Sequence, residues 1–101
     1  MIKVDRFIKC LKINDLNFST GVPDSLLKEL CFSIEDKFKK NHVAAANEGS
    51  AVGLAIGYHF KTGKIPIVYL QNSGFGNMIN PILSLADKNV FNIPLFIIMG
   101  W

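Results

Sequence analysis

The sequence contains little cysteine, and the two thiols that it has exclude several kinds of site. Cys10 and Cys31 lack CxxC spacing and have no paired histidine. This pattern disfavours a disulfide or a zinc site. We therefore expect two buried or half-buried free thiols in a reducing, cytoplasmic compartment.

Long apolar runs and one-signed charge patches are also missing. No stretch approaches the roughly 20 apolar residues that span a bilayer, and charges interrupt residues 1–15, unlike in a signal peptide. The net charge is +3, but basic residues cluster only at 37–40. A solvated helix end explains that cluster better than a nucleic-acid site, so we expect no membrane and no nucleic-acid partner.

Several motifs of well-known chemistry are absent. The sequence has no GxSxG nucleophile turn, no Gly-Lys-Ser/Thr phosphate loop and no GxGxxG fingerprint. Neither His42 nor His59 has a cysteine or acidic residue at the spacing typical of metal ligands. We interpret them structurally, His42 as the start of a strand and His59 as the end of a helix, and expect no metal ligands in this chain.

What the sequence does contain is an alternation of strand and helix patterns over 101 residues, half of them hydrophobic. Its strands are apolar runs without alternation, which is typical of a parallel sheet covered on both faces. We predict an α/β fold with an open parallel sheet and helices on both faces. The predicted helices cover residues 3–13, 26–34, 48–60 and 78–86, and the predicted strands cover 17–20, 42–47, 64–71 and 93–100.

Local signals refine these elements. Asp24 or Ser25 is expected to cap the second helix, and Pro81 to lie in the first turn of the last one. The last strand ends at Gly100 and is followed only by Trp101, which we expect in the core or an interface. An open parallel sheet normally continues into another crossover, so we expect an incomplete domain, either a fragment, a truncated product or one subunit of a split protein.

Four loops are expected to form the site. In open parallel sheets ligands bind beyond the carboxyl ends of the strands. The segments that follow the predicted strands are rich in glycine or polar side chains, and they read "GVPDS", "NEGS", "QNSGFGN" and "GW".

Glu48 stands out as a carboxylate in a run of small and apolar residues. A helix N-terminus favours negative charge, so a helix-start role and a ligand-binding role both stay open. Gly49, Gly53 and Gly57 lie four apart on one helical face, which predicts close approach of another backbone. Burial there would raise the pKa of the carboxyl and allow proton exchange with a bound heterocycle.

The segments "FSTGVPDSLLKEL", "AAANEGSAVGLAIGYHFKTGKIPIVYLQNSGFGNMINPILSLAD" and "IPLFIIMGW" resemble the N-terminal part of a thiamine-diphosphate-dependent decarboxylase family. Its members include phosphonopyruvate decarboxylase and sulfopyruvate decarboxylase. "GVPDS" and "GW" look more like the phosphonopyruvate enzyme. The resemblance implies conversion of 3-phosphonopyruvate to phosphonoacetaldehyde and carbon dioxide, in phosphonate biosynthesis.

The resemblance also implies residue roles. Glu48 matches the glutamate that hydrogen-bonds a ring nitrogen of the cofactor's aminopyrimidine and promotes ylid formation. Asp24 and Ser25 match a polar position that contacts substrate or relays protons. The remaining expected contacts to cofactor or substrate are Gln71, Asn72, Ser73, Gly74 and Asn77.

The family's second cofactor half, a Gly-Asp-Gly segment followed by an asparagine for magnesium and diphosphate, does not occur in the sequence. The resemblance therefore implies a partial pyrimidine-binding domain over residues 1–101, inactive alone. It would pair with a diphosphate-binding domain or in a homo-oligomer. Two alternatives stay open, namely a sulfopyruvate decarboxylase subunit and a truncated, non-catalytic interaction domain.

Overall fold

A four-stranded parallel sheet lies at the centre of the chain, and the computed structural model describes all residues 1–101. The strands are arranged in the order β2-β1-β3-β4, and every neighbouring pair is parallel. This confirms the predicted α/β class. The strands span Ser19–Gly21 (β1), His42–Ala44 (β2), Ile67–Gln71 (β3) and Phe96–Gly100 (β4).

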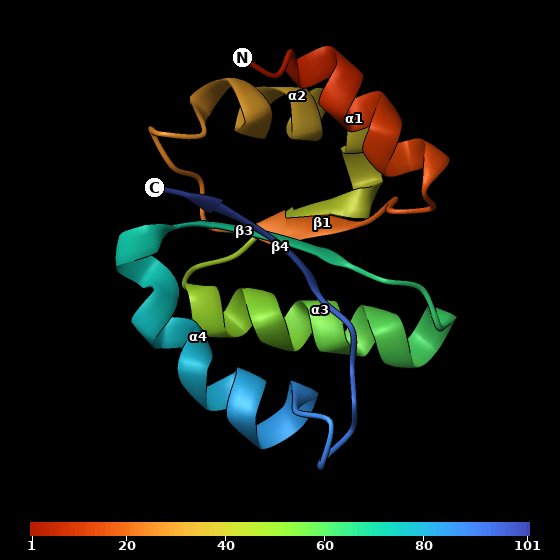
Figure 1. Cartoon of the computed structure of the whole chain (residues 1–101), viewed down its shortest axis with the longest axis vertical. Helices are drawn as coiled ribbons and strands as arrows, with labels where there is room; N and C mark the ends of the chain where they lie inside the picture. The colour runs from red at the N-terminus through yellow and green to blue at the C-terminus, as the bar shows by residue number, and fades with distance from the viewer.

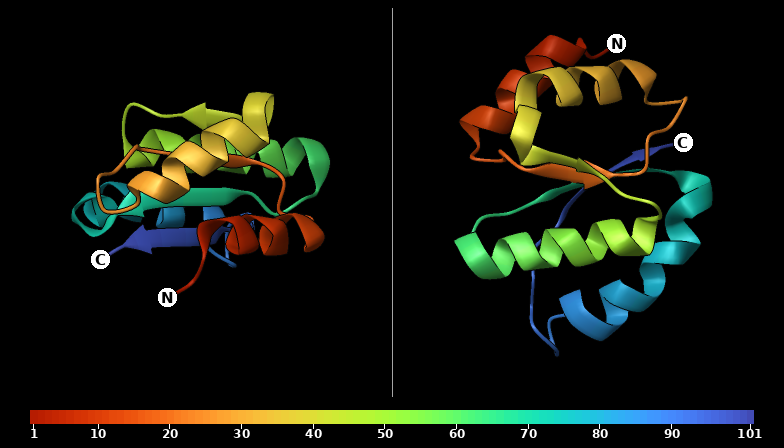
Figure 2. Two further views of the ribbon diagram at one scale, coloured as in Figure 1. Left: turned by 90° about the horizontal axis from the view of Figure 1, so that it is seen from above. Right: turned by 180° about the vertical axis from the view of Figure 1, so that it is seen from behind.

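Helices cover both faces of the sheet (Figure 1). Helices α1 and α2 lie on one face, while α3 and α4 lie on the other, and the right-hand view of Figure 2 shows the same three layers from behind. None of the helices has the length and apolar character that crossing a bilayer requires. The helices are α1 (Val4–Ile13), α2 (Lys28–Phe38), α3 (Glu48–Thr62), α4 (Phe75–Pro81) and the π-helical η3 (Ile82–Ala86), with 3-10 turns η1 (Lys39–Asn41) and η2 (Asn72–Gly74).

The central strand β3 separates two hydrophobic cores. Successive side chains of a strand point to opposite faces. Ile67 and Tyr69 therefore join the core under α1 and α2, whereas Val68 and Leu70 join the core over α3 and α4. Because all four side chains are buried, β3 reads as a continuous apolar run, as a strand covered on both faces should.

The side chain of Tyr69 crosses the neighbouring strand. A methyl group placed on Gly21 of β1 would overlap the Tyr69 carbonyl oxygen and lie 2.7 Å from two atoms of its ring. The ring continues past Gly21 to β2, where the Tyr69 hydroxyl lies 2.7 Å from Nε2 of His42. Glycine is favoured at position 21 because a side chain there would meet both the carbonyl oxygen and the ring of Tyr69.

Two helix starts differ from the predictions. Asp24 and Ser25 do not cap α2. This helix begins at Lys28, and the residue at its N-cap position, Leu27, provides no side-chain hydrogen bond. Asp24 instead closes a turn, since its Oδ1 accepts a hydrogen bond from the Leu26 backbone N–H at 3.1 Å. Pro81 is the last residue of α4 and not in its first turn, because η2 leads directly into a helix that begins three residues early.

Surface features follow the sequence in part. Both cysteines are free, but Cys10 is exposed, contrary to prediction, while Cys31 is half-buried as predicted. Trp101 is 90% exposed, which rules out the core as its place in this chain. Lys37, Lys39 and Lys40 are exposed at the end of α2 and in η1, as predicted. His42 begins β2 and His59 lies in the last turn of α3, which confirms both assignments.

Candidate functional site

The carboxyl ends of all four strands lie at one edge of the sheet, because every strand pair is parallel. Gly21 is in register with Ala44 and Tyr69, and Gln71 is in register with Gly100. The four polar or glycine-rich loops predicted to form the site therefore start from neighbouring strand ends. This is the edge at which open parallel sheets bind ligands.

Glu48 is the first residue of α3, but its carboxylate does not cap that helix. The capping group is the side chain of Asn47, whose Oδ1 accepts a hydrogen bond from the Ser50 backbone N–H at 2.9 Å. The half-buried Glu48 side chain turns toward α4 instead, where its Oε2 accepts a hydrogen bond from Nδ2 of Asn77 at 2.8 Å. Asn47 therefore supplies the side-chain cap, while Glu48 keeps a first-turn position at which a helix favours negative charge.

Two glycines create the space around this carboxylate. A methyl group on the buried Gly74 would overlap the Glu48 carboxylate and lie 2.7 Å from its Cγ. A methyl group on Gly49 would lie 2.9 Å from the carbonyl oxygen of Asn77. The first turns of α3 and α4 consequently touch at Gly49, which confirms the predicted close backbone approach for that glycine.

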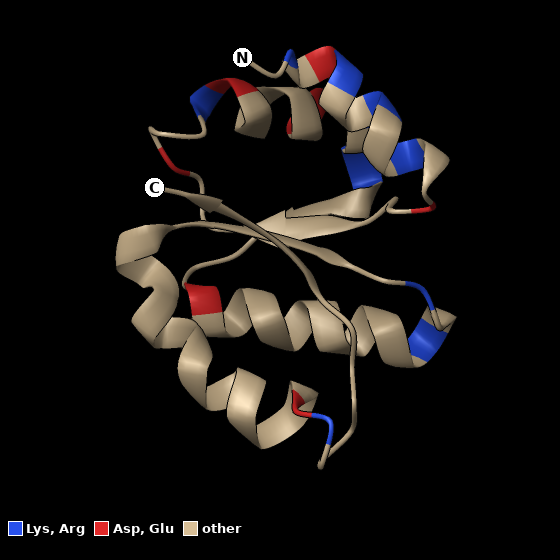
Figure 3. Cartoon of the chain, in the orientation of Figure 1, with Lys and Arg blue, Asp and Glu red and all other residues tan.

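Gly53 and Gly57 do not share this role. Nothing lies within 4 Å of a methyl group at either position, so the predicted close approach is wrong within this chain. Their face of α3 is open, and it is flanked by an exposed Leu54. Figure 3 shows that α3 and α4 carry charge only near the start and the end of α3. An uncharged helix face with two glycines is thus left uncovered.

A second group of residues forms around Asp24. This side chain is only 8% exposed, and its Oδ2 has no hydrogen-bond partner. A methyl group on Gly100, at the end of β4, would lie 2.7 Å from that oxygen. The loop after β1 therefore reaches over the end of β3 to β4. A small cavity of about 230 Å³ lies beside it, lined by Pro23, Asp24, Ser25, Lys28, Cys31 and Phe32.

The predicted site residues thus separate into two groups. Glu48, Gly74 and Asn77 are in direct contact, whereas Asp24 and Ser25 share the small cavity and no hydrogen bond joins them to Glu48. The rest lie at or just after the end of β3, with Gln71 and Asn72 half-buried and Ser73 exposed.

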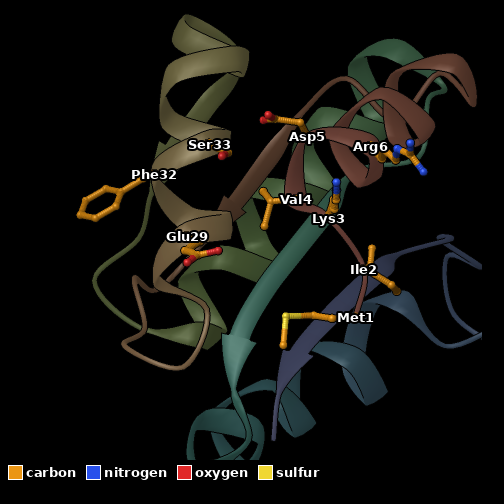
Figure 4. A pocket seen from close by; sticks show the side chains of 9 residues that line it. All are labelled: Met1, Ile2, Lys3, Val4, Asp5, Arg6, Glu29, Phe32 and Ser33. Carbon is orange, nitrogen blue, oxygen red and sulfur yellow. The ribbon is translucent and has the colours of Figure 1, made fainter.

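The largest cavity of the chain is elsewhere. It measures about 800 Å³ and lies between the N-terminal segment and α2, as Figure 4 shows. None of the predicted site residues lines it. No group of three or more His, Cys, Asp or Glu side chains is arranged to hold a metal ion.

The hydrogen-bonded pair of His42 and Tyr69 under α2 was not predicted from the sequence. Burial lowers the pKa of His42, and the nearby Glu35 opposes that shift. Burial also raises the pKa of Tyr69, with smaller contributions from Cys31 and Glu35, while burial raises the pKa of Cys31 near Asp24. A tyrosine inside an apolar strand was the available signal, because a buried phenol needs a hydrogen-bond partner.

Comparison with known proteins identifies the family. Residues 3–101 match the family model described as thiamine pyrophosphate enzyme, N-terminal TPP binding domain. The chain belongs to this family. Among solved structures of thiamine-dependent enzymes, benzoylformate decarboxylase from Polynucleobacter necessarius aligns with 99% of this chain and 18% of its own, with a TM-score of 0.78 and 27% identity.

Curated relatives of this TPP-binding domain include two kinds of decarboxylase. Sulfopyruvate decarboxylase subunit alpha from Methanocaldococcus jannaschii is 36% identical over 90 residues, which are 89% of this chain and 52% of the relative. Phosphonopyruvate decarboxylase from Streptomyces hygroscopicus is 33% identical over 81 residues, which are 80% of this chain and 20% of the relative. The chain thus spans about half of the first and a fifth of the second.

The order of these two relatives differs from the expectation drawn from "GVPDS" and "GW", which favoured the phosphonopyruvate enzyme. The sulfopyruvate relative has the higher identity over the longer stretch.

Proposed function

We propose that this TPP-binding domain supplies the pyrimidine half of the active site in a thiamine-diphosphate-dependent decarboxylase. Its substrate would be a three-carbon 2-oxo acid with a second anionic group on C3. Sulfopyruvate is the first candidate because of the higher identity to that relative, and 3-phosphonopyruvate is the second because of the "GVPDS" and "GW" segments.

The observation that carries the proposal is the placement of Glu48. The Glu48 side chain lies at the edge of the sheet where the strands end. Asn77 donates a hydrogen bond to its Oε2 and not to its Oε1. An ionised carboxylate oxygen is an acceptor for a ring N–H, and once protonated it is a donor. The residues present therefore fit an aminopyrimidine, because Oε1 of Glu48, which lies beside Gly74, has no hydrogen-bond partner within the chain.

The chemistry would be divided between the chain and its cofactor. When bound, thiamine diphosphate supplies the electron sink for the bond to the departing carboxylate. Glu48 would hold or release a proton at the ring nitrogen. Asp24 and Ser25 would contact substrate from the loop after β1, and Gln71, Asn72 and Ser73 would line the pocket from the loop after β3.

A partner would complete this site. We infer that magnesium and the diphosphate are held by a separate diphosphate-binding domain, in another subunit or another copy, and that this chain alone is inactive. The open, uncharged face with Gly53 and Gly57 supports the pairing, because glycines in an exposed helix cost about 1 kcal/mol each and a close-packed partner backbone would offset that cost.

The test is a pair of Glu-to-Gln variants in the assembled protein. Release of carbon dioxide from each 2-oxo acid is measured with thiamine diphosphate and magnesium. Glu48→Gln should lower kcat by about 100-fold or more, because it removes a proton-transfer group. The control Glu35→Gln changes an exposed acid on α2, across the sheet, and should keep full activity. Equal activity in the two variants would contradict the role of Glu48. In the unaltered assembly, the 2-oxo acid with the higher kcat/KM would be identified as the substrate.

A further inference from the structure

The Glu48 side chain is held by the neighbouring helix and not by its own. Asn47 already accepts a hydrogen bond from one of the free backbone donors at the start of α3, the N–H of Ser50. The Glu48 carboxylate instead accepts a hydrogen bond from a residue 29 positions later, Asn77, the third residue of α4. Its orientation therefore depends on how the two helix starts pack.

That packing leaves little freedom for the carboxylate. Gly49 lets the backbone of Asn77 approach α3, which brings the Asn77 amide within 2.8 Å of Oε2. On the other side the buried Gly74 lies against the Cγ and the carboxylate of Glu48. The carboxylate is thus confined between the side chain of Asn77 and the backbone of Gly74.

The hydrogen bond from Asn77 makes the two oxygens of the Glu48 carboxylate unequal. An ionised carboxylate only accepts hydrogen bonds, so Asn77 must present its NH₂ group to Oε2. An amide nitrogen neither gives up nor takes a proton near neutral pH, so this bond persists while Glu48 changes its protonation state. Because Oε2 already accepts the amide N–H, it is the less basic oxygen, and Oε1 is the favoured site for a proton.

We propose that Asn77 is the positioning residue of Glu48, because its amide occupies Oε2 and directs the exchangeable proton to Oε1. Gly74 takes part by leaving room for the carboxylate. The part that concerns proton transfer to a cofactor rests on the proposed function, whereas the orientation of Glu48 is a property of the chain itself. Asn77 would accordingly act on the reaction through Glu48 and not as a direct contact of the ligand.

The closing experiment uses Asn77→Asp, which is nearly isosteric but replaces the donor by an acceptor. The matched control is Asn80→Asp on the same helix, since Asn80 is exposed and its side chain pairs with Ser84 and not with Glu48. Thermal unfolding establishes that both variants fold. The first readout is the nuclear Overhauser effect between the γ-protons of Glu48 and the α-protons of Gly74 in the chain without cofactor.

This contact should be lost in Asn77→Asp, where two carboxylates repel, and retained in Asn80→Asp. The second readout is kinetic, in the assembled protein: kcat should fall by about 100-fold with little change in KM, as for a misplaced catalytic group. Retention of the Glu48–Gly74 contact in Asn77→Asp would overturn the proposal. The other outcome separates the two proposals. If the Glu48–Gly74 contact is lost in Asn77→Asp but the unaltered assembly binds no thiamine diphosphate, the positioning role of Asn77 is supported and the proposed function is overturned.

Discussion

Tyr69 and His42 are hydrogen-bonded across a strand that separates them. The hydroxyl of Tyr69 on β3 lies 2.7 Å from Nε2 of His42 on β2, and Gly21 of β1 lies beneath the tyrosine ring. This arrangement connects β2 and β3 through side chains across β1, in addition to the backbone ladder of the sheet. It makes the α2 face of the sheet dependent on one residue without a side chain.

The variant Gly21→Ala should destabilise the chain by about 1–3 kcal/mol, as overpacking of a core does. The added methyl group has no space beside the carbonyl and ring of Tyr69. The free energy of unfolding in urea measures the loss. An unchanged midpoint would mean that the ring moves aside at little cost.

The stability of the chain should fall as the pH is lowered from about 8 to about 5. Because burial lowers the pKa of His42, the unfolded chain binds a proton more readily than the folded one. The contribution of His42 is therefore present above its ordinary pKa near 6.5 and is lost as the pH falls below it. Urea unfolding at several pH values measures the slope, which His42→Gln should flatten. An equal slope in that variant would assign the effect to other groups.

Gly74→Ala should weaken binding of thiamine diphosphate to the assembled protein by about tenfold or more, through loss of a positioned contact. The backbone of Gly74 has φ −88° and ψ −3°, which alanine adopts freely, so the effect would come from contact with Glu48. Gly76→Ala is the matched control because a methyl group there meets nothing within 4 Å. Calorimetric titration compares the two, and equal affinities would contradict the role of Gly74.

Gly57→Ala should have opposite effects on folding and on association. Alanine at this exposed helical position should stabilise the isolated chain by about 0.5–1 kcal/mol. If a partner backbone packs on this face, the methyl group should also weaken the complex. Urea unfolding and sedimentation velocity measure the two effects. A complex of undiminished affinity would place the partner on another surface.

Asp24→Asn should raise the free energy of unfolding by about 1 kcal/mol while lowering activity, as a stability–activity trade-off predicts. The variant removes a buried charge whose Oδ2 has no partner, and it keeps the acceptor for the Leu26 N–H. The exposed Asp36→Asn provides the control for loss of one charge. Full activity together with higher stability would show that Asp24 has no part in the reaction.

Much of the fold could be predicted from local patterns. Apolar runs of strand length marked β3 and β4, and helical spacing marked α1 and α3, since burial on both faces or on one stripe leaves a direct trace in the sequence. Parallel strands then placed the loops at one edge. The prediction of Glu48 as the start of α3 followed from the change of pattern at that residue.

The remaining features depend on tertiary contacts that no local pattern encodes. Which of three evenly spaced glycines meets another backbone is decided by where α4 packs, and only Gly49 lies there. Asp24 closes a turn because its loop extends to β4. The partner of Tyr69 is fixed by strand order, which puts β2 next to β1 and not at the opposite edge.

The uncharged exterior of α3 and α4 has a kinetic consequence. Between its ends this layer offers no charge to attract or repel a partner (Figure 3). Encounter through that face would proceed without electrostatic steering, at roughly 10⁵–10⁶ M⁻¹s⁻¹. Its rate should then be nearly insensitive to ionic strength, although the chain as a whole carries a net charge of +3.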